Sequence, residues 1–255
     1  MSDGHIALAG LGHRFDNGLV ALREVDLAVA PGEFVSIVGP SGCGKSTILR
    51  ILAGVLAPSA GQVSIDGVDV RGRPGSAAYM AQKDLLLPWR RAIDNAVLGS
   101  ELDRTDEAAA RERALAWFER FGLAGFERAW PHELSGGMRQ RLALLRTFLF
   151  RRDVLLLDEP FGALDAITRQ DMVTWLAEVW AADRRTALLV THDVEEALLL
   201  SDRVEVMSGR PGTIIDSVAV PLERPRPAEL VTEPEFVALR ARILRSLRSG
   251  HALAH

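Results

Sequence analysis

The 255-residue sequence has one cysteine, no long apolar run and no excess of basic residues. The lone Cys43 excludes an internal disulfide, which fits a reducing compartment. Residues 51–57 form the longest apolar run, far short of the roughly 20 residues that a membrane-spanning helix needs. The formal net charge of −4 gives no basic footprint for nucleic acid, and residues 1–10 lack the pattern of an export signal. We therefore expect a cytosolic protein that binds no nucleic acid.

What the sequence does contain is an ordinary globular composition arranged as alternating strands and helices. Apolar residues make up 48% and charged residues 25%, and the length allows one large α/β domain or two small ones. Short apolar runs at 35–38, 154–159 and 186–193 predict buried strands, and helical spacing follows the first two. This alternation favours a mostly parallel sheet covered on both faces. Asp66-Gly67, within 63–70, indicates a hairpin.

The middle of the chain, residues 84–150, is predicted to be a helical insertion. Thr105 is expected to cap its first helix, with Asp106 and Glu107 in the first turn, and Gly122 to end it. The residues expected on the inner face of that helix are Leu115, Phe118 and Phe121. A second helix is expected after Ser135. Its inward residues would be Met138, Leu142, Leu145 and Leu149.

The stretch GPSGCGKST, residues 39–47, fits a phosphate-binding P-loop. It follows a predicted strand and opens a predicted helix, which disfavours the alternative of a glycine-rich turn without a ligand. Backbone N–H groups of residues 41–46 would surround the β-phosphate, Lys45 would reach the β- and γ-phosphates, and Ser46 would offer its hydroxyl to Mg²⁺. The candidate nucleotide-binding residues of this loop are Gly39, Pro40, Ser41, Gly42, Cys43, Gly44, Lys45, Ser46 and Thr47.

Two acids end the strand VLLLDE, residues 154–159. Asp158 can hold Mg²⁺ through water. Glu159 comes next, so its side chain points elsewhere and suits a general base for the attacking water. His192 follows the strand ALLVT, where a neutral imidazole can contact the γ-phosphate. Without the P-loop, the acids would be two exposed carboxylates and His192 a surface histidine.

Three further residues lie near these motifs. Gln82, between the β-rich first part and the helical insertion, can reach the metal and sense the γ-phosphate. Phe15, in HRFDNG, can stack on adenine or simply pack in the core. Cys43 lies near a helix N-terminus and Lys45, and both features would lower the pKa of its thiol. We expect it not to be catalytic, but its alkylation is expected to block nucleotide binding, with ATP protecting.

A second glycine turn, LSGGMRQR at residues 134–141, is built like another anion cradle. Its candidate residues are Ser135, Gly136 and Gly137. Because it lies beyond the helical insertion, we expect it to lie away from the P-loop of its own chain. A head-to-tail homodimer accounts for both cradles, since each ATP is then held by the P-loop of one chain and capped by the LSGGM turn of the other.

Taken in order, these motifs resemble the ATP-binding subunits of ABC transporters. The resemblance covers residues from about 5 to 220 and is carried by Phe15, the P-loop 39–47, Gln82, LSGGM 134–138, VLLLDE 154–159, ALDA 163–166 and His192. It implies a P-loop ATPase core with a mostly parallel sheet, an antiparallel β part and an inserted α-helical subdomain. It implies ATP and Mg²⁺ as cofactors. The implied catalytic residues are Lys45, Glu159 and His192, and the implied metal ligands are Ser46, Gln82 and Asp158.

The resemblance also implies that Asp165 lies at the dimer interface and connects the two sites. Met138 departs from the general pattern, because many members have glutamine there, but not from one branch of the family. That branch comprises importers of nitrate, sulfonates, taurine and bicarbonate. The stretches similar to it are LLLPWR 85–90, SGGMRQR 135–141, LLLDEPFGALDAITR 155–169 and RPG 210–212. QKDLLLPW, residues 82–89, is also similar to importers of thiamine-precursor pyrimidines.

An importer subunit of this kind implies a permease dimer in the membrane, an external solute-binding protein acting indirectly, and a peripheral position on the cytoplasmic face of the inner membrane. In relatives, the region after Gln82 receives a coupling helix of the permease. Leu85, Leu86, Leu87, Pro88 and Trp89 would line that groove here, although about half of them would be core instead.

Two other functions fit the P-loop but not the rest of the sequence. A soluble ABC ATPase of DNA repair or translation usually carries two ATPase units or a long coiled-coil arm, which 255 residues do not accommodate. A P-loop kinase would leave LSGGMRQR and His192 without a role. The transported solute is not readable from these residues, because selection belongs to the binding protein and the permease.

We therefore expect a single ABC ATPase domain, residues 1–255. Residues 1–83 and 151–220 would form its catalytic core, and 84–150 a helical subdomain that carries the LSGGM turn. The tail 221–255 is rich in proline and arginine, with an amphipathic helix at 234–248. That helix is expected to be docked or solvated; a basic amphipathic helix is also what binding to a membrane surface needs. The tail is too short for a regulatory β-domain.

Overall fold

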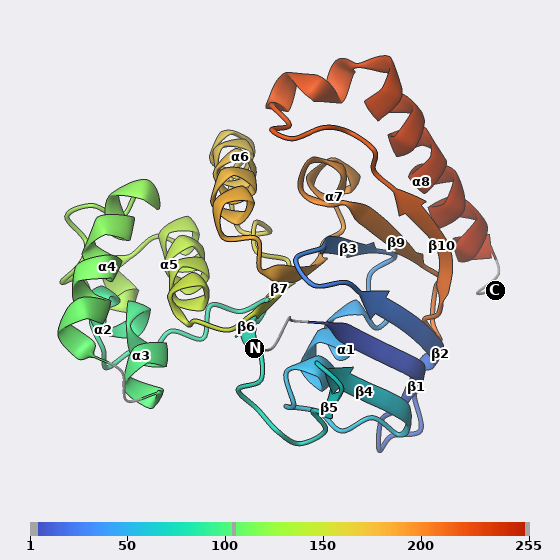
Figure 1. Ribbon diagram of the computed structural model, residues 1–255, viewed down its shortest axis with the longest axis horizontal. Coiled ribbons are helices and arrows are strands. Elements are labelled where there is room, and N and C mark those ends of the chain that lie inside the picture. Colours follow the sequence, from blue (N-terminus) through green and yellow to red (C-terminus); the bar gives the residue numbers. More distant parts are fainter. Residues whose placement is uncertain (1–4, 104–105, 253–255) are drawn as a thin grey trace.

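The computed structural model describes residues 5–103 and 106–252, and its centre is a mostly parallel sheet of strands ordered β10-β9-β3-β8-β7-β6 (Figure 1). The parallel strands are β6 (Ala78–Met80), β7 (Val154–Asp158), β8 (Thr186–Val190), β3 (Phe34–Val38) and β9 (Arg203–Met207). β10 (Ile214–Ala219) pairs with β9 in the antiparallel sense. Every residue of β3, β7 and β8 is buried, because helices and the second sheet cover both faces. The expected parallel sheet is confirmed.

A second, antiparallel sheet holds the N-terminal part, in the order β2-β1-β4-β5. Its strands are β1 (Ile6–Arg14), β2 (Val20–Val29), β4 (Ala60–Ile65) and β5 (Val68–Asp69). Asp66 and Gly67, both at positive φ, form the expected hairpin turn between β4 and β5. Helix α1 (Lys45–Leu52) lies between the two sheets, and its buried Ile48 and Leu52 join side chains of both in one core cluster.

Four helices lie together beside the sheets, at the left of Figure 1. They are α2 (Ala92–Ala96), α3 (Leu98–Leu102), α4 (Glu107–Arg120) and α5 (Gly136–Leu149), with the short η1 (Pro131–Glu133) before α5. α5 begins after Ser135, as expected. Among its expected inward residues, Leu142 and Leu145 are fully buried, whereas Met138 and Leu149 are partly buried against the same core.

Helix α4 corrects two details of the sequence analysis. Asp106 caps it rather than lying in the first turn, because its carboxylate accepts hydrogen bonds from the N–H groups of Ala108 and Ala109. The expected cap, Thr105, lies outside the described residues. Leu115 is wrong as an inward residue, since it is 52% exposed.

The buried seam of α4 runs instead through Ala110, Ala114 and Phe118 at i, i+4 and i+8, so Leu115 lies about 100° round the helix from Ala114. The helix ends as predicted, with Phe121 buried at its C-cap and Gly122 at φ +60.

Helices α6 (Ala166–Asp183) and α7 (Val194–Leu200) pack near the central sheet, and α8 (Pro234–Ala252) runs along β10 and β9 at the outer edge (Figure 1). The tail before α8 includes η2 (Ala228–Thr232). Arg226 is buried, and its guanidinium donates hydrogen bonds to the carbonyls of Leu198, Ser201, Val220 and Leu222. Phe236 and Ile243 of α8 are fully buried. The tail is therefore docked on the core.

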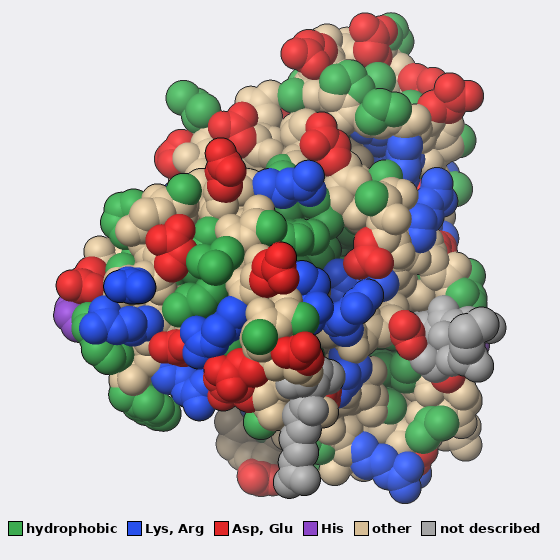
Figure 2. Space-filling model, turned by 60° about the vertical axis from the view of Figure 1, so that its left-hand side comes forward, with side chains coloured by type: hydrophobic (Ala, Val, Ile, Leu, Met, Phe, Trp, Pro, Cys, Tyr) green, Lys and Arg blue, Asp and Glu red, His purple; other side chains and the backbone are tan. Residues whose placement is uncertain are grey.

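Basic and acidic side chains are interspersed over the face drawn in Figure 2, as the near-balanced composition predicts. In the part of the chain that the structure describes, none of the helices combines the length and the apolarity that crossing a membrane requires.

Candidate nucleotide-binding site

A cavity of about 510 Å³ opens at the C-terminal ends of the parallel strands, above the P-loop. Segments far apart in the sequence form its walls. The lining residues are Phe15, Leu19, Ala21, Ser41, Gly42, Gly44, Lys45, Ser46, Thr47, Gln82, Glu159, His192 and Arg210. The loop ends of a parallel sheet are the usual place for a ligand in α/β proteins, because connections diverge there and leave a crevice.

The P-loop turns directly from β3 into α1, and its glycines make that turn possible. Gly42 and Gly44 have φ of +75° and +108°. A Cβ on Gly44 would also overlap the side chain of Leu22. The first turn of α1 therefore points its free backbone N–H groups at the cavity, where they attract an anion.

Lys45 and Ser46 hold defined positions at the floor of the cavity. The Lys45 ammonium donates hydrogen bonds to the carbonyls of Gly39 and Pro40, at 2.7 and 2.8 Å. The Ser46 hydroxyl donates to Oδ1 of Asp158 at 2.9 Å. Burial raises the pKa of Asp158, and the hydrogen bond from Ser46 opposes that rise. A hydroxyl and a carboxylate side by side form the kind of oxygen pair that Mg²⁺ accepts when phosphates and water complete its shell.

Glu159, Gln82 and His192 converge at one side of the cavity from three different loops. The strand ends at Asp158, and Glu159 follows it at φ +48 with its N–H donating to the carbonyl of Val190 at 2.8 Å. Oε2 of Glu159 accepts a hydrogen bond from Nε2 of Gln82 at 3.1 Å and lies 3.6 Å from Nδ1 of His192. The hydrogen bond to β8 thus fixes the backbone position of Glu159. Its carboxylate points toward the two side chains expected near a γ-phosphate.

Phe15 and Cys43 differ in how they relate to the cavity. Phe15 lines it and also packs against the core, with His13 edge-on to its ring at 4.6 Å. Cys43 is 1% exposed and faces the core beneath the loop. The expected lowering of its thiol pKa is wrong, because burial raises the pKa of Cys43 and outweighs the charge of Lys45. A reagent must therefore open the loop to alkylate it.

The second glycine turn lies outside this cavity. Ser135 caps α5, its hydroxyl accepting a hydrogen bond from the N–H of Met138 at 3.2 Å. Ser135 and Gly136 are exposed, and neither belongs to the residues that line the P-loop cavity in the described chain. The helix behind the turn does reach the site, since Nε2 of Gln140 lies 3.4 Å from the carbonyl oxygen of Glu159.

Sequence reasoning missed Arg210 as a site residue. Nε and Nη2 of its guanidinium donate to the carbonyl of Gly42 at 3.0 and 2.8 Å, and the side chain lines the cavity. Gly212 brings the turn this close, because a Cβ there would overlap the Cys43 carbonyl. RPG 210–212 entered the sequence analysis only as a branch resemblance. A contact between residues 168 positions apart leaves no local signal.

The segment after Gln82 is half exposed, as expected. Leu86 is 8% exposed, whereas Leu85 and Trp89 are 60% and 70% exposed. Two arginines of α5 hold the segment: Arg139 pairs with Asp84 at 3.1 Å, and Arg146 donates to the carbonyls of Asp84 and Leu85. The exposed apolar side chains are thus carried by a loop that is tied both to Gln82 and to the helix of the second turn.

Comparison with known proteins agrees with the motifs. Residues 22–162 match the model of the family described as "ABC transporter". The aliphatic sulfonates import ATP-binding protein of Rhodococcus jostii is 52% identical over 219 residues, 86% of this chain and 84% of that protein. The taurine import ATP-binding protein of Yersinia pestis is 40% identical over 233 residues, 89% of this chain and 91% of that protein.

Two solved structures have the same fold. A dimeric bacterial ABC transporter cassette superposes with a TM-score of 0.77 at 29% identity, over 86% of this chain and all of that chain. The same cassette in a dimeric post-hydrolysis state with ADP and phosphate gives 0.77 at 28% identity, again over 86% and 100%.

Proposed function

The chain belongs to the ABC transporter family, and from that premise we propose that it is the ATP-hydrolysing subunit of an importer whose solute is a sulfonate. The observation that carries the solute class is the 52% identity with an aliphatic sulfonates import protein along most of both chains. The likeness to a taurine import protein points the same way, since taurine is itself an aminosulfonate. Nitrate, bicarbonate and thiamine-precursor pyrimidines remain the alternatives within this branch.

Binding of ATP follows from the P-loop geometry. The N–H groups at the start of α1 and the Lys45 ammonium provide positive charge around the β- and γ-phosphates. Lys45 has only to exchange the Gly39 and Pro40 carbonyls for phosphate oxygens. Ser46 and Asp158 would hold Mg²⁺, which when bound neutralises charge on the phosphates. Phe15 would lie against the adenine at the far wall of the cavity.

Hydrolysis is assigned to the side of the cavity where Glu159 lies. Its carboxylate would accept a hydrogen bond from the attacking water and take up the proton as the new P–O bond forms and the bond between the γ-phosphorus and the leaving ADP oxygen breaks. His192 would contact the γ-phosphate beside that water, and Gln82 would keep the Glu159 carboxylate in position. The distances of 3.1 and 3.6 Å in this group support those roles.

The second glycine turn would complete the site in a dimer. Ser135 and the N–H groups of Gly136 and Gly137 are exposed or partly exposed at a helix start, which suits contact with the γ-phosphate of a partner chain. The dimeric state of the similar cassettes supports this arrangement. Asp165, which caps α6 by accepting from the N–H of Thr168, would lie at the same interface.

The permease would dock on the segment after Gln82. Leu85 and Trp89 offer exposed apolar area. The ion pair and hydrogen bonds from Arg139 and Arg146 connect that area to α5, so that movement at the γ-phosphate would reach the membrane subunit. This docking would hold the chain peripherally at the cytoplasmic face of the inner membrane, and an external solute-binding protein would act through the permease.

The test is uptake of labelled solutes in a strain that lacks the gene. Taurine, an alkanesulfonate, nitrate, bicarbonate and a thiamine-precursor pyrimidine are supplied in parallel. We expect loss of sulfonate or taurine uptake, restored by the wild-type gene and not by Glu159→Gln. Normal sulfonate uptake together with loss of one of the other solutes would reject the sulfonate assignment while keeping the importer.

A further inference from the structure

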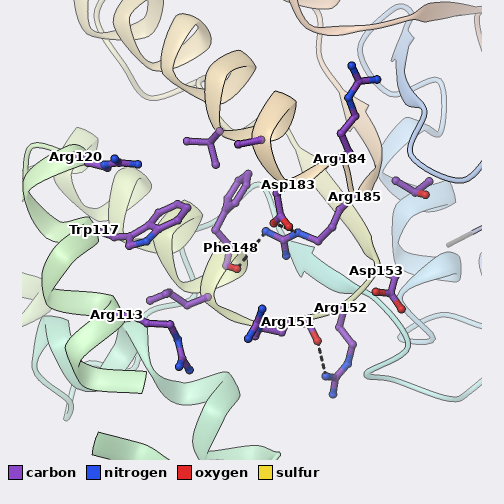
Figure 3. A pocket seen from close by; sticks show the side chains of 14 residues that line it. Arg113, Trp117, Arg120, Phe148, Arg151, Arg152, Asp153, Asp183, Arg184 and Arg185 are labelled. Carbon is purple, nitrogen blue, oxygen red and sulfur yellow. Dashed lines mark hydrogen bonds and ion pairs between the residues drawn. The ribbon is translucent and has the colours of Figure 1, made fainter. Parts of the chain in front are cut away.

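A second cavity, of about 560 Å³, lies at the opposite end of the strands from the P-loop (Figure 3). It is bounded by α4, the end of α5, the segment before β7 and the turn between α6 and β8. Asp153 directly precedes β7 and Arg185 directly precedes β8, so this cavity is at the N-terminal ends of strands whose C-terminal ends carry Asp158 and His192. It is therefore separate from the ATP site.

The walls of this cavity are unusually basic for an acidic chain. Six arginines line it against two aspartates, whereas the whole protein has a net charge of −4. The arginines are Arg113, Arg120, Arg151, Arg152, Arg184 and Arg185. The lining of this cavity therefore carries an excess of positive charge, although the chain as a whole is acidic.

Two of these arginines already form ion pairs with carboxylates of the chain. Arg152 makes a two-pronged ion pair with Asp103, at 2.7 Å on both contacts. Arg185 pairs with Asp183 at 2.6 Å and lies over the ring of Phe148. Burial lowers the pKa of Arg185, and the ion pair with Asp183 opposes that lowering. Two of the six arginines are therefore paired with carboxylates within the fold.

The remaining four guanidinium groups make no ion pair with a carboxylate of the described residues. Arg113 and Arg120 come from α4, Arg151 from the segment before β7, and Arg184 from the turn after α6. Figure 3 shows Arg113, Arg120 and Arg151 around the cavity, whereas the guanidinium of Arg184 points away from them and lies 5.5 Å from the centroid of the Trp180 ring. Guanidinium forks from different elements recognise phosphate oxygens well, because each can donate two parallel hydrogen bonds.

The floor of the cavity is aromatic. Trp117 and Phe148 lie near-parallel, with ring centroids 6.3 Å apart and planes inclined by 28° (Figure 3). Trp117 is only partly buried, so part of its ring borders the cavity. A flat ring laid on such a floor gains stacking energy, which phosphate contacts alone do not supply.

We propose that this cavity binds a small organic polyphosphate, a compound with at least two phosphate groups and a flat ring, as in a nucleotide. Its phosphates bridge Arg120 on α4 and Arg151 before β7, and its ring lies on Trp117. The cavity volume lies within the range of roughly 300–1,000 Å³ that small-molecule sites occupy. A ligand held in this way ties α4 to the segment before β7, the strand that ends at Asp158, so that the site is suited to regulate the ATPase from outside its nucleotide cleft.

The test is isothermal titration calorimetry on the full chain with its ATP site filled by excess MgADP. The probe is adenosine 3′,5′-bisphosphate, which has separated phosphates and no β-phosphate for the P-loop, and tripolyphosphate is the ringless comparison. We expect one bisphosphate per chain, bound at least about tenfold more weakly by the double variant Arg120→Ala/Arg151→Ala. Trp117→Leu should weaken the bisphosphate several-fold and leave tripolyphosphate unchanged.

The matched control is Arg71→Ala/Arg73→Ala, which removes the same charge from exposed positions near β5. It should bind the bisphosphate within about twofold of wild type, since screened surface charges contribute little. Equal binding by both double variants, or the absence of a second binding event up to millimolar probe, would overturn the proposal. So would an unchanged bisphosphate affinity in Trp117→Leu, because the ring contact is part of the assignment. Retained MgADP binding in each variant shows that the chain is folded.

Discussion

The P-loop and the LSGGM turn are built from the same parts and have opposite surroundings. Each is a glycine turn that opens a helix, α1 in one case and α5 in the other. The P-loop is enclosed: Lys45 is buried, Arg210 holds the Gly42 carbonyl, and Asp158 bonds Ser46. The LSGGM turn is open, with Ser135 and Gly136 exposed. A glycine turn at a helix start therefore indicates the type of ligand, whereas only its surroundings show whether the same chain supplies the rest of the site.

Removing the proposed general base beside the P-loop should have the largest effect on hydrolysis. We expect Glu159→Gln to lower the ATP hydrolysis rate by roughly 10²–10⁴-fold, the usual contribution of a positioned general base. ATP binding should persist, because the P-loop contacts remain, and an ATP-bound dimer should accumulate. Hydrolysis and size-exclusion chromatography with light scattering at saturating ATP measure both. A variant that stays monomeric at micromolar concentration and saturating ATP would count strongly against the shared site.

The open cradle should be needed for hydrolysis but not for binding. We expect Ser135→Arg to lower hydrolysis by roughly 10²-fold, as loss of a donor at a developing charge does, with ATP affinity within about twofold of wild type. The control is Ser249→Arg, an equal change at an exposed position of α8, which should leave both unchanged. Loss of ATP binding itself would place Ser135 in the site of its own chain.

Mixing two inactive variants should restore part of the ATPase activity. A chain with Lys45→Ala has a defective P-loop and an intact LSGGM turn, and Ser135→Arg has the reverse. In a head-to-tail heterodimer both defects fall on one site and the other site is wild type, so the mixture should recover up to about a quarter of the wild-type rate. If each chain used its own two cradles, the mixture would stay as inactive as its components.

The sequence was sufficient for the parts of this picture that depend on local pattern. The parallel sheet, the hairpin at Asp66 and Gly67, and the start of α5 at Ser135 follow from apolar period, turn chemistry and capping. The prediction that Leu115 points inward was wrong because two possible buried faces of α4 are offset by a single residue. Only the neighbouring packed side chains decide which face is buried.

What sequence could not supply were the contacts between distant segments and the depth of burial. Arg210 reaches the P-loop from 168 residues away, so no motif links them. Cys43 was assigned a lowered thiol pKa from the charge of Lys45, whereas its burial beneath the loop raises the pKa. The arginine-lined cavity likewise gathers side chains from four segments that show no common pattern.

Substitution of Arg210 should weaken the P-loop site more mildly. Removing its guanidinium frees the Gly42 carbonyl and takes a positive charge from the cavity wall. We expect Arg210→Ala to raise the KM for ATP by about five- to tenfold, the range of a charge-assisted hydrogen bond, and to change kcat less. Arg210→Lys should restore part of the affinity because the charge returns without the fork. Equal losses in kcat with an unchanged KM would instead give Arg210 a role in the chemical step.

The last expected effect concerns Glu196, a buried acid of α7. Among the described residues, the LSGGM turn has no buried acid of this kind beside it. Burial raises the pKa of Glu196 to about 7, while the hydroxyl of Thr191, which donates to it at 2.6 Å, opposes the rise. Asp193 raises this pKa further, and Arg169 and His192 lower it.

Because the folded-state pKa of Glu196 lies above its unfolded value, the protonated form favours folding. That stability is present below about pH 4.5 and is lost as the pH rises through about 7. Glu196→Gln keeps a neutral group, so its free energy of unfolding should exceed that of wild type by on the order of 2–3 kcal/mol at pH 8.5 and by nearly nothing at pH 4. Urea unfolding at the two pH values measures this difference. A gain that is the same at both would assign the effect to packing, since only a titrating carboxyl makes the variant's advantage grow with pH.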